Sequence, residues 1–509
     1  MQGNLLGKGG HLSEYKLILL AVVGYILIQA AFAPGMYVSI DEHTYIKNAF
    51  LLREGKIAQQ DPGYACRSTL YTEKGYVASQ FIGRSLFLLP FTFLGLLGIM
   101  FSGLAIHLIN FFGIVLVLRR MGANALFSLL YLFYPAFILN SRSVSPELLV
   151  LTGFIFGLYF YLGNRARSWL FSGFFFGLAA LARYDAIFGL GAFAAASLLS
   201  NRKRAAMLLL GALPVGIAIL SFNGWAYGGT LATGHGSGLG LAGRLLTEGI
   251  IDVDNLIYPL LLLIFYPLLI ASPFLAKKFP LKGEFLLLIA VYLVLNSTFT
   301  SFLDFNFSVQ TTFTARLRYL VPLLGLLMIP YAQFLSEKIG ELRLANFRLG
   351  PFGIRDLQKH RSALLCALVI VMLGLSAFAS AKHAALSDSR VAVLEEISSQ
   401  IPQGSTVIGS SDDCIYFQKN LFGDRKYYNI DIAWDIAGNP QGITLDSLKG
   451  PATYVIAVNY SYLEGKTGPR QQIVVDERRQ VADFIDGHTG SLTPVWGGEG
   501  KTVRIYKWE

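Results

Sequence analysis

The sequence contains little charge. Only 15% of its 509 residues are Asp, Glu, Lys or Arg, whereas a typical soluble domain has about 25%. The deficit falls on residues 16–380, where long apolar runs give the whole chain a mean hydropathy of +0.52. An ordinary soluble protein is therefore excluded. The net charge of +10 does not indicate nucleic-acid binding, because the basic residues sit in short loops between apolar runs, although bound anionic lipid fits it.

Cysteine is also scarce, and no internal repeat is visible. Cys366 falls within an apolar run, while Cys66 and Cys414 are compatible with an extracytoplasmic pair that their spacing does not demand. The lack of repeats counts against secondary transporters, which are commonly built from them. No cleavable signal peptide is evident. The run Leu17–Phe32 ends in small residues that would also suit cleavage, but we interpret it as an uncleaved first span.

The apolar runs predict about eleven membrane-spanning helices. They occur near 16–33, 103–118, 125–140, 147–163, 168–183, 186–200, 205–222, 256–275, 284–300, 319–336 and 363–380. A further run, 85–100, is interpreted as juxtamembrane, because all the basic loops then fall on one side, the cytoplasm. If 85–100 crossed, Arg119, Arg120 and every later basic loop would change sides.

This topology places five segments on the outer face: 34–102, 141–146, 223–255, 301–318 and the C-terminal residues 381–509. The predicted fold class is thus a polytopic α-helical membrane protein with juxtamembrane helices and a C-terminal α/β soluble domain. Residues 1–380 would form the membrane module. In the tail, helices are expected at 391–401 and 477–485, and strands at 405–409, 454–459 and 502–508. The tail shows no catalytic constellation, so acceptor binding, covering of the membrane site or support of the fold are equally compatible with it.

The first outer segment carries the strongest chemical signal. Ser39 and Glu42 fit a capping box, and Tyr45 begins an apolar stripe along the helix that follows. Asp41 and Glu42 would then stand at the N-terminus of a surface helix, just above the first span. They either take part in chemistry or only complement the helix dipole, and the segment alone does not decide between these readings.

The second signal, Asn140-Ser141-Arg142-Ser143-Val144-Ser145-Pro146-Glu147, is expected on the same face. Glu147 opens a membrane helix and is compatible with a shared cavity with Asp41. The simpler reading of Glu147 is a dipole partner after Pro146, and that of Arg142 is snorkelling to the interface.

The remaining candidates lie farther along the chain. Arg316 and Arg318 stand at the outer end of a span, where topology does not favour positive charge and a guanidinium fork suits a phosphate. Arg183 and Asp185 are expected to form a local ion pair, with an ancillary role in the site as the alternative. His235 lies in a Gly-rich segment that could act as a lid.

Taken in order, these motifs resemble the C-type integral-membrane glycosyltransferases, with spans one to ten in similar order and spacing. Asp41-Glu42 with Tyr45 is similar to the acidic motif of the protein O-mannosyltransferase and aminoarabinose transferase branch. The run 177–185, GLAALARYD, and the Arg-Tyr-Leu-x-Pro of 318–322 are similar to further family segments. The chain departs from the family in having Glu147 where many members have Asp, and in lacking the Trp-Trp-Asp-Tyr-Gly motif of oligosaccharyltransferases.

The resemblance implies an inverting enzyme of the cell envelope that moves a sugar from a polyprenyl-phosphate donor to a lipid, glycan or protein acceptor at the outer face of the cytoplasmic membrane. Asp41 would be the general base, with Arg316 and Arg318 holding the lipid phosphate. Glu42 and Glu147 would orient the acceptor or help bind a cation. Substrate-binding candidates are Arg142, Tyr45, Arg183, His235 and Tyr319.

A divalent metal, Mg or Mn, is compatible with Asp41 and Glu147 but is not required by them, and no other cofactor is indicated. The alternative functions are a membrane transporter, or a polymerase or ligase of lipid-linked polysaccharide. A transporter predicts charged residues near the middle of the bilayer, and the apolar runs hold almost none.

Overall fold

The computed structural model describes thirteen stretches of the chain. They are residues 8–37, 39–64, 69–234, 236–237, 266–297, 317–344, 348–349, 352–353, 361–417, 419–431, 442–458, 469–497 and 503–509. Most of them are helical.

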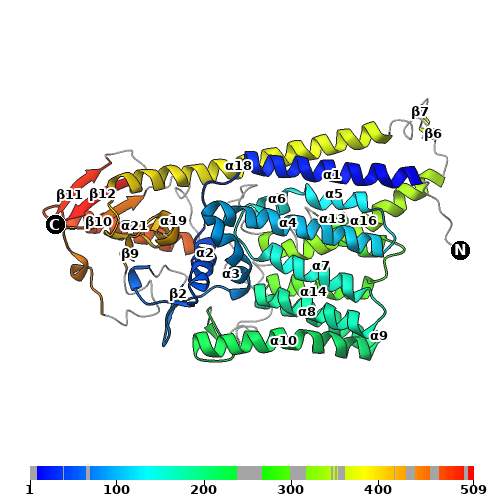
Figure 1. Cartoon of the computed structure of the whole chain (residues 1–509), viewed down its shortest axis with the longest axis horizontal. Helices are drawn as coiled ribbons and strands as arrows, with labels where there is room; N and C mark the ends of the chain where they lie inside the picture. Colours follow the sequence, from blue (N-terminus) through cyan, green and yellow to red (C-terminus); the bar gives the residue numbers. More distant parts are fainter. Residues whose placement is uncertain are drawn as a thin grey trace.

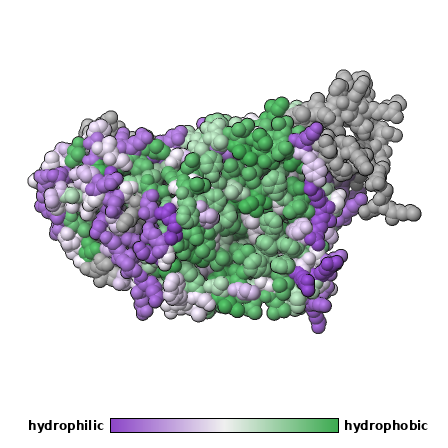
Figure 2. All heavy atoms as spheres, in the orientation of Figure 1, coloured by the Kyte–Doolittle hydropathy of each residue, from purple (hydrophilic) through white to green (hydrophobic). Residues whose placement is uncertain are grey.

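Long apolar helices lie side by side and form the larger part of the molecule (Figure 1). They are α1 (Lys8–Ala31), α4 (Gly95–Arg120), α7 (Glu147–Tyr161), α8 (Ala166–Ala182), α9 (Ile187–Ser200), α10 (Arg202–Tyr227), α13 (Pro267–Leu275), α14 (Lys282–Ser297), α16 (Val321–Leu344) and α18 (Arg361–Gln400). Figure 2 shows an apolar band over this part, with hydrophilic residues at both of its ends. Among the described residues, four helical stretches are long and apolar enough to cross a bilayer on their own. A polytopic membrane protein is thus confirmed, while the count of eleven crossings stays a prediction.

Glycine allows two of these helices to approach closely. A Cβ built on Gly173 of α8 would lie 1.9 Å from the carbonyl oxygen of Leu208 in α10, and one on Gly211 would lie 1.9 Å from that of Leu170. Small residues bring helix backbones together in this way where burial of apolar surface offers no drive for association. The α8–α10 pair therefore depends on the absence of side chains at these positions.

Two predicted apolar runs differ from the structure. The run 125–140 is not one helix but a 3-10 turn, η3 (Ala125–Ser128), followed by α5 (Leu129–Leu132) and α6 (Pro135–Ser141), because Pro135 cannot continue a helix and starts a new one. The run 85–100 is divided at Gly95, whose φ is +64°. Before it lie α3 (Ile82–Leu88) and η2 (Leu89–Leu94), and after it residues 95–100 form the first turns of α4.

Before α3, the first outer segment contains α2 (Ile40–Arg53), the short 3-10 turn η1 (Pro62–Tyr64) and a small antiparallel sheet. The sheet has the order β1-β3-β2 and consists of β1 (Ala58–Gln59), β2 (Thr69–Thr72) and β3 (Gly75–Ala78). The stripe expected on α2 is confirmed, since Tyr45, Ile46, Ala49 and Phe50 are all buried. Two short hairpins, β4 (Ala232–Thr233) with β5 (Gly236–Ser237) and β6 (Arg348–Leu349) with β7 (Phe352–Gly353), complete the membrane part.

The C-terminal residues build a five-stranded sheet of order β11-β12-β10-β8-β9. Its strands are β8 (Thr406–Gly409), β9 (Lys426–Asn429), β10 (Thr453–Val458), β11 (Leu492–Trp496) and β12 (Val503–Trp508). The strands expected at 405–409, 454–459 and 502–508 are β8, β10 and β12. The helix expected at 477–485 lies within α21 (Pro469–Gly487), which packs Val481 and Ile485 against the sheet. The segments η8 (Ser411–Phe417), α19 (Lys419–Phe422) and η9 (Asp446–Leu448) connect the strands.

Helix α18 joins the two parts without interruption. The sequence suggested a span ending at 380 and a separate helix over 391–401, but both belong to this one 40-residue helix. Gln29 of α1 donates a hydrogen bond to the Ser380 hydroxyl over 3.0 Å. The Ser387 hydroxyl bonds both the N–H and the carbonyl of Met36, each over 2.8 Å. The start of the first outer segment is thereby fixed to α18.

Candidate active site

The site is organised around the N-terminus of α2, where a short polar sequence caps the helix. The Ser39 hydroxyl accepts a hydrogen bond from the backbone N–H of Glu42 at 3.3 Å and lies 3.1 Å from Glu42 Oε1. The other oxygen of Glu42 accepts from the backbone N–H of Val144 at 2.8 Å. Glu42 is therefore buried, and its hydrogen bonds connect the first outer segment to the loop before α7.

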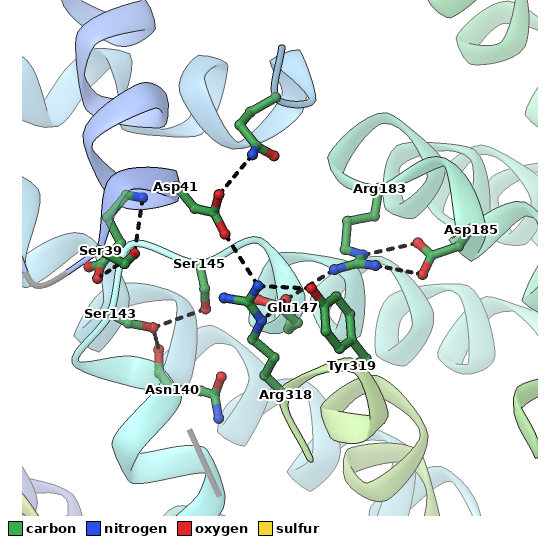
Figure 3. Close-up of polar contacts among 12 residues, drawn as sticks. Ser39, Asp41, Asn140, Ser143, Ser145, Glu147, Arg183, Asp185, Arg318 and Tyr319 are labelled. Atoms are coloured by element: carbon green, nitrogen blue, oxygen red, sulfur yellow. Dashed lines mark hydrogen bonds and ion pairs between the residues drawn. The ribbon is translucent and has the colours of Figure 1, made fainter. Parts of the chain in front are cut away.

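Asp41 points into the site from the same helix turn and is more accessible. Its Oδ1 accepts a hydrogen bond from Gln80 at 3.0 Å, and its Oδ2 accepts one from Arg318 Nη2 at 3.2 Å (Figure 3). Its side chain keeps 37% of its exposed area, whereas that of Glu147 keeps 2%. Of these two carboxylates, Asp41 is thus the one that a ligand can reach.

Arg318 lies between the two acidic segments. It belongs to η7 (Leu317–Leu320), a 3-10 turn at the start of α16. Its Nη2 donates to Asp41 and, over 2.8 Å, to the Tyr319 hydroxyl, while its Nε is 3.9 Å from Glu147 Oε1. Its guanidinium also lies over the Tyr319 ring, 4.9 Å from the centroid. The partly exposed guanidinium of Arg318 therefore faces two carboxylates and makes a cation–π contact with the Tyr319 ring.

Arg183 closes the cluster from the end of α8. Its Nε and Nη2 make a bidentate pair with Asp185 at 3.0 and 2.8 Å, and its Nη1 donates to Glu147 Oε1 at 3.1 Å. The expected Arg183–Asp185 pair is therefore present, and it is joined to the site through Glu147. Glu147 Oε2 is buried without a hydrogen-bond partner among the described residues.

No motif in the sequence singles out Gln80 or Arg84, yet both lie at the site. Gln80 donates to Asp41 and accepts from the Tyr45 hydroxyl at 3.2 Å, so it holds both side chains. Arg84 is fully buried on α3, donates to Ser102 over 3.1 Å, and has no hydrogen-bond partner for Nε and Nη1 among the described residues. Both residues reach the site because α3 packs beside α2, which is a tertiary contact that no local sequence pattern indicates.

The other predicted site residues fall in different places. Arg142 is buried against the end of α1, where it donates to Gln29 Oε1 over 2.7 Å and to the Phe32 carbonyl, so it braces the fold beneath the loop rather than facing the cluster. Tyr45 is buried, and this burial, together with the charges of Asp41 and Glu147, raises its pKa well above the usual range. His235 and Arg316 lie outside the described residues.

A divalent metal at this site stays a prediction. Asp41 and Glu147, the candidates for holding it, both face Arg318, whose guanidinium compensates their charge. In the part of the chain that the structure describes, no group of three His, Cys, Asp or Glu side chains is gathered that could hold a metal ion.

The fold and this cluster place the chain in a structural class. No family model matches the sequence, and no curated protein does. The structure superposes on that of ArnT from Cupriavidus metallidurans bound to undecaprenyl phosphate, with a TM-score of 0.61 at 12% identity over 96% of this chain and 97% of that one. The apo state of the same ArnT gives 0.59 at 12% identity over 97% and 98%. The C-type glycosyltransferase fold expected from the motifs is thus confirmed.

Proposed function

We propose that the protein is a glycosyltransferase that moves a sugar from a polyprenyl-phosphate donor to an acceptor hydroxyl. One observation carries this proposal: a partly exposed aspartate and an arginine, from segments 277 residues apart, form a hydrogen-bonded pair at the ends of apolar helices. A reaction between a lipid-borne phosphate and a water-borne acceptor needs this combination at the membrane surface. The similarity in fold to an ArnT bound to undecaprenyl phosphate agrees with it.

Arg318 is assigned to the leaving group. When the anomeric C–O bond breaks, negative charge develops on the departing phosphate, which is already acidic and needs electrostatic stabilisation rather than a proton. A guanidinium can present two N–H groups to such a phosphate. Both carboxylates near Arg318 have other donors, Gln80 for Asp41 and Arg183 for Glu147. Arg318 can therefore turn toward a ligand without leaving either carboxylate unsatisfied.

Asp41 is assigned as the general base. It accepts the proton of the acceptor hydroxyl as that oxygen bonds to the anomeric carbon, and the configuration of that carbon inverts. Its exposure suits this role, whereas Glu42 is committed to the Val144 N–H and Glu147 is buried. General-base catalysis by a positioned carboxylate contributes roughly 10²–10⁴-fold in rate.

The site is assigned to the outer face of the cytoplasmic membrane. Cys414, in the C-terminal part, is disulfide-bonded. Disulfides persist in oxidising compartments and are rare in the cytosol. The C-terminal sheet and α2 lie at the same end of the apolar helices (Figure 1), which supports assigning both to one side of the membrane.

The test is transfer of radiolabelled sugar from a panel of polyprenyl-phosphate sugars to native membrane extract, with purified wild type and Asp41→Asn. We expect label to move with the wild type and the rate to fall at least 100-fold with the variant, at an unchanged thermal midpoint. Asp185→Asn is a matched control, because it removes a carboxylate of the same cluster that is not assigned to the chemistry. Equal transfer by Asp41→Asn and wild type would show that Asp41 is only part of the helix N-terminus. No transfer from any donor would exclude the donor class.

A further inference from the structure

A cavity lies on another face of α2, between that helix and the C-terminal sheet. Its volume is about 240 Å³. One wall consists of His43, Lys47 and Leu51, which follow one another at intervals of four residues along one face of α2. The remaining lining comes from the β1–η1 segment and from the C-terminal part: Glu54, Lys56, Ala58, Gln59, Gln60, Asp61, Gly63, Tyr64, Cys414, Phe417, Asn420 and Tyr427. The proposed chemistry does not use this cavity.

His43 presents a hydrogen-bond acceptor to this cavity. The Tyr37 hydroxyl has one proton, which it donates to the Ile415 carbonyl over 2.8 Å. The same hydroxyl lies 3.1 Å from His43 Nδ1, so Nδ1 must carry the proton and donate to it. Nε2 is then an unprotonated acceptor. Burial, aided by the charge of Lys47, lowers the pKa of His43 to about 3, so the ring stays neutral at physiological pH.

The charges around the cavity are largely balanced. The Glu54 carboxylate pairs with Lys56 at 3.1 Å, and the Asp61 carboxylate pairs with Lys426 at 2.8 Å. Both carboxylates are therefore compensated, and neither is left to bind a free cation. The other polar groups of the lining are the Lys47 ammonium, which is a donor with interactions of its own, the His43 imidazole, which accepts, and the amides of Gln59, Gln60 and Asn420, which do both.

Aromatic rings complete the lining. Phe417 and Tyr427 are stacked with their centroids 5.0 Å apart, and both line the cavity together with Tyr64. A small-molecule site typically combines such apolar surface with a few placed polar groups. A neutral ring bearing several hydroxyls satisfies this pattern, because each hydroxyl both donates and accepts.

We propose that this cavity binds a neutral sugar unit of the acceptor, so that the acceptor is a glycan rather than a lone hydroxyl compound. The proposal rests on the function assigned above. His43 follows Asp41 by two residues, yet it faces the cavity while Asp41 faces Arg318. An α-helix with its side chains is about 10–12 Å across. An acceptor that reaches both faces of α2 must therefore extend beyond a single sugar ring.

The experiment measures binding directly in the full chain reconstituted in lipid nanodiscs. Saturation-transfer NMR is recorded with free glucose, galactose, mannose, N-acetylglucosamine and glucuronate, and phosphorus NMR with inorganic phosphate. Asn420→Trp fills the cavity from an exposed rim position, and Ser398→Trp, on an exposed face of α18, is the matched control. Lys47→Met provides a second variant that removes a donor. We expect at least one neutral sugar to bind, with affinity reduced tenfold or more by Asn420→Trp and unchanged by Ser398→Trp.

Several outcomes would overturn the cavity proposal: no neutral sugar binds, phosphate alone binds, or Asn420→Trp binds as well as the wild type. Its failure can be told apart from failure of the proposed function, because binding is measured without turnover. Sugar binding without any transfer supports the site and refutes the transferase. When transfer is present, Asn420→Trp should raise the KM for a glycan acceptor tenfold or more and leave donor hydrolysis by water unchanged. An unchanged KM would refute the acceptor role.

Discussion

Replacing each of the two arginines of the site with glutamine should separate chemistry from folding. In the described part of the chain, Arg183 is the only hydrogen-bond donor to Glu147 and the only one to Asp185. Arg183→Gln thus leaves a carboxylate with 2% side-chain exposure and only a 3.9 Å contact to Arg318. Breaking a buried pair from one side costs about 3–5 kcal/mol. Arg318→Gln leaves Asp41 bonded to Gln80 and Glu147 bonded to Arg183, so we expect a loss of stability of about 1 kcal/mol.

The effect on rate should run the other way. Removing one donor aimed at a developing anion typically costs 10²–10³-fold in kcat, and we expect that loss for Arg318→Gln. Arg318→Lys should recover only part of it, because an ammonium lacks the planar fork. The assays are thermal unfolding in one detergent and initial transfer rates per folded molecule. Arg318→Gln with a rate within threefold of wild type, or with a midpoint lowered as far as that of Arg183→Gln, would refute the assignment of Arg318 to the phosphate.

Three further substitutions test other parts of the structure. Glu42→Ala should lower stability by about 1.5–3 kcal/mol, because the buried Val144 N–H loses a charged acceptor, and Glu42→Gln should retain more activity than Asp41→Asn in the transfer assay. The pKa of His43 is about 3 in the folded protein and about 6.5 in the unfolded chain, so the unfolded chain binds the proton more readily. The free energy of unfolding should therefore fall as the pH drops from about 6.5 toward 3, by up to ~1.4 kcal/mol per pH unit. In thermal melts recorded at several pH values, His43→Asn should flatten this slope. Gly173→Ala should lower the thermal midpoint, since its Cβ would meet a carbonyl at 1.9 Å, whereas Gly191→Ala, which meets nothing within 4 Å, should not.

Local sequence patterns predicted correctly those features that depend only on residues close together in the chain. The Ser39 cap, the buried stripe of α2 and three strands of the C-terminal sheet follow from residues adjacent in the sequence. The run 125–140 was misinterpreted because hydropathy outweighed Pro135, although a proline at that point predicts the break. The continuity of α18 does not follow from hydropathy, because its apolar half predicts a membrane span and its polar half predicts a separate soluble helix.

The site required information that no local pattern holds. The sequence placed Asp41, Glu147 and Arg318 on one face, but not that Arg318 would lie between the two carboxylates. From the sequence, Arg142 is predicted to be an interfacial or substrate-binding residue. The contacts of Arg142 to Gln29 and Phe32 depend instead on how α1 packs against the loop. Gln80 and Arg84 have no distinguishing neighbours in the sequence. Their importance arises only from the packing of α3 against α2.

The unbroken α18 also has a mechanical consequence. Forty residues of helix extend about 60 Å, roughly twice the thickness of a bilayer's hydrocarbon core. This one helix therefore connects the lipid to the five-stranded sheet, and the bonds of Ser387 to Met36 attach the segment that leads into α2 to the same helix. A membrane of different thickness changes the tilt of such a helix. A change in bilayer thickness would then change the distance between the sheet and α2, and with it the width of the cavity between them.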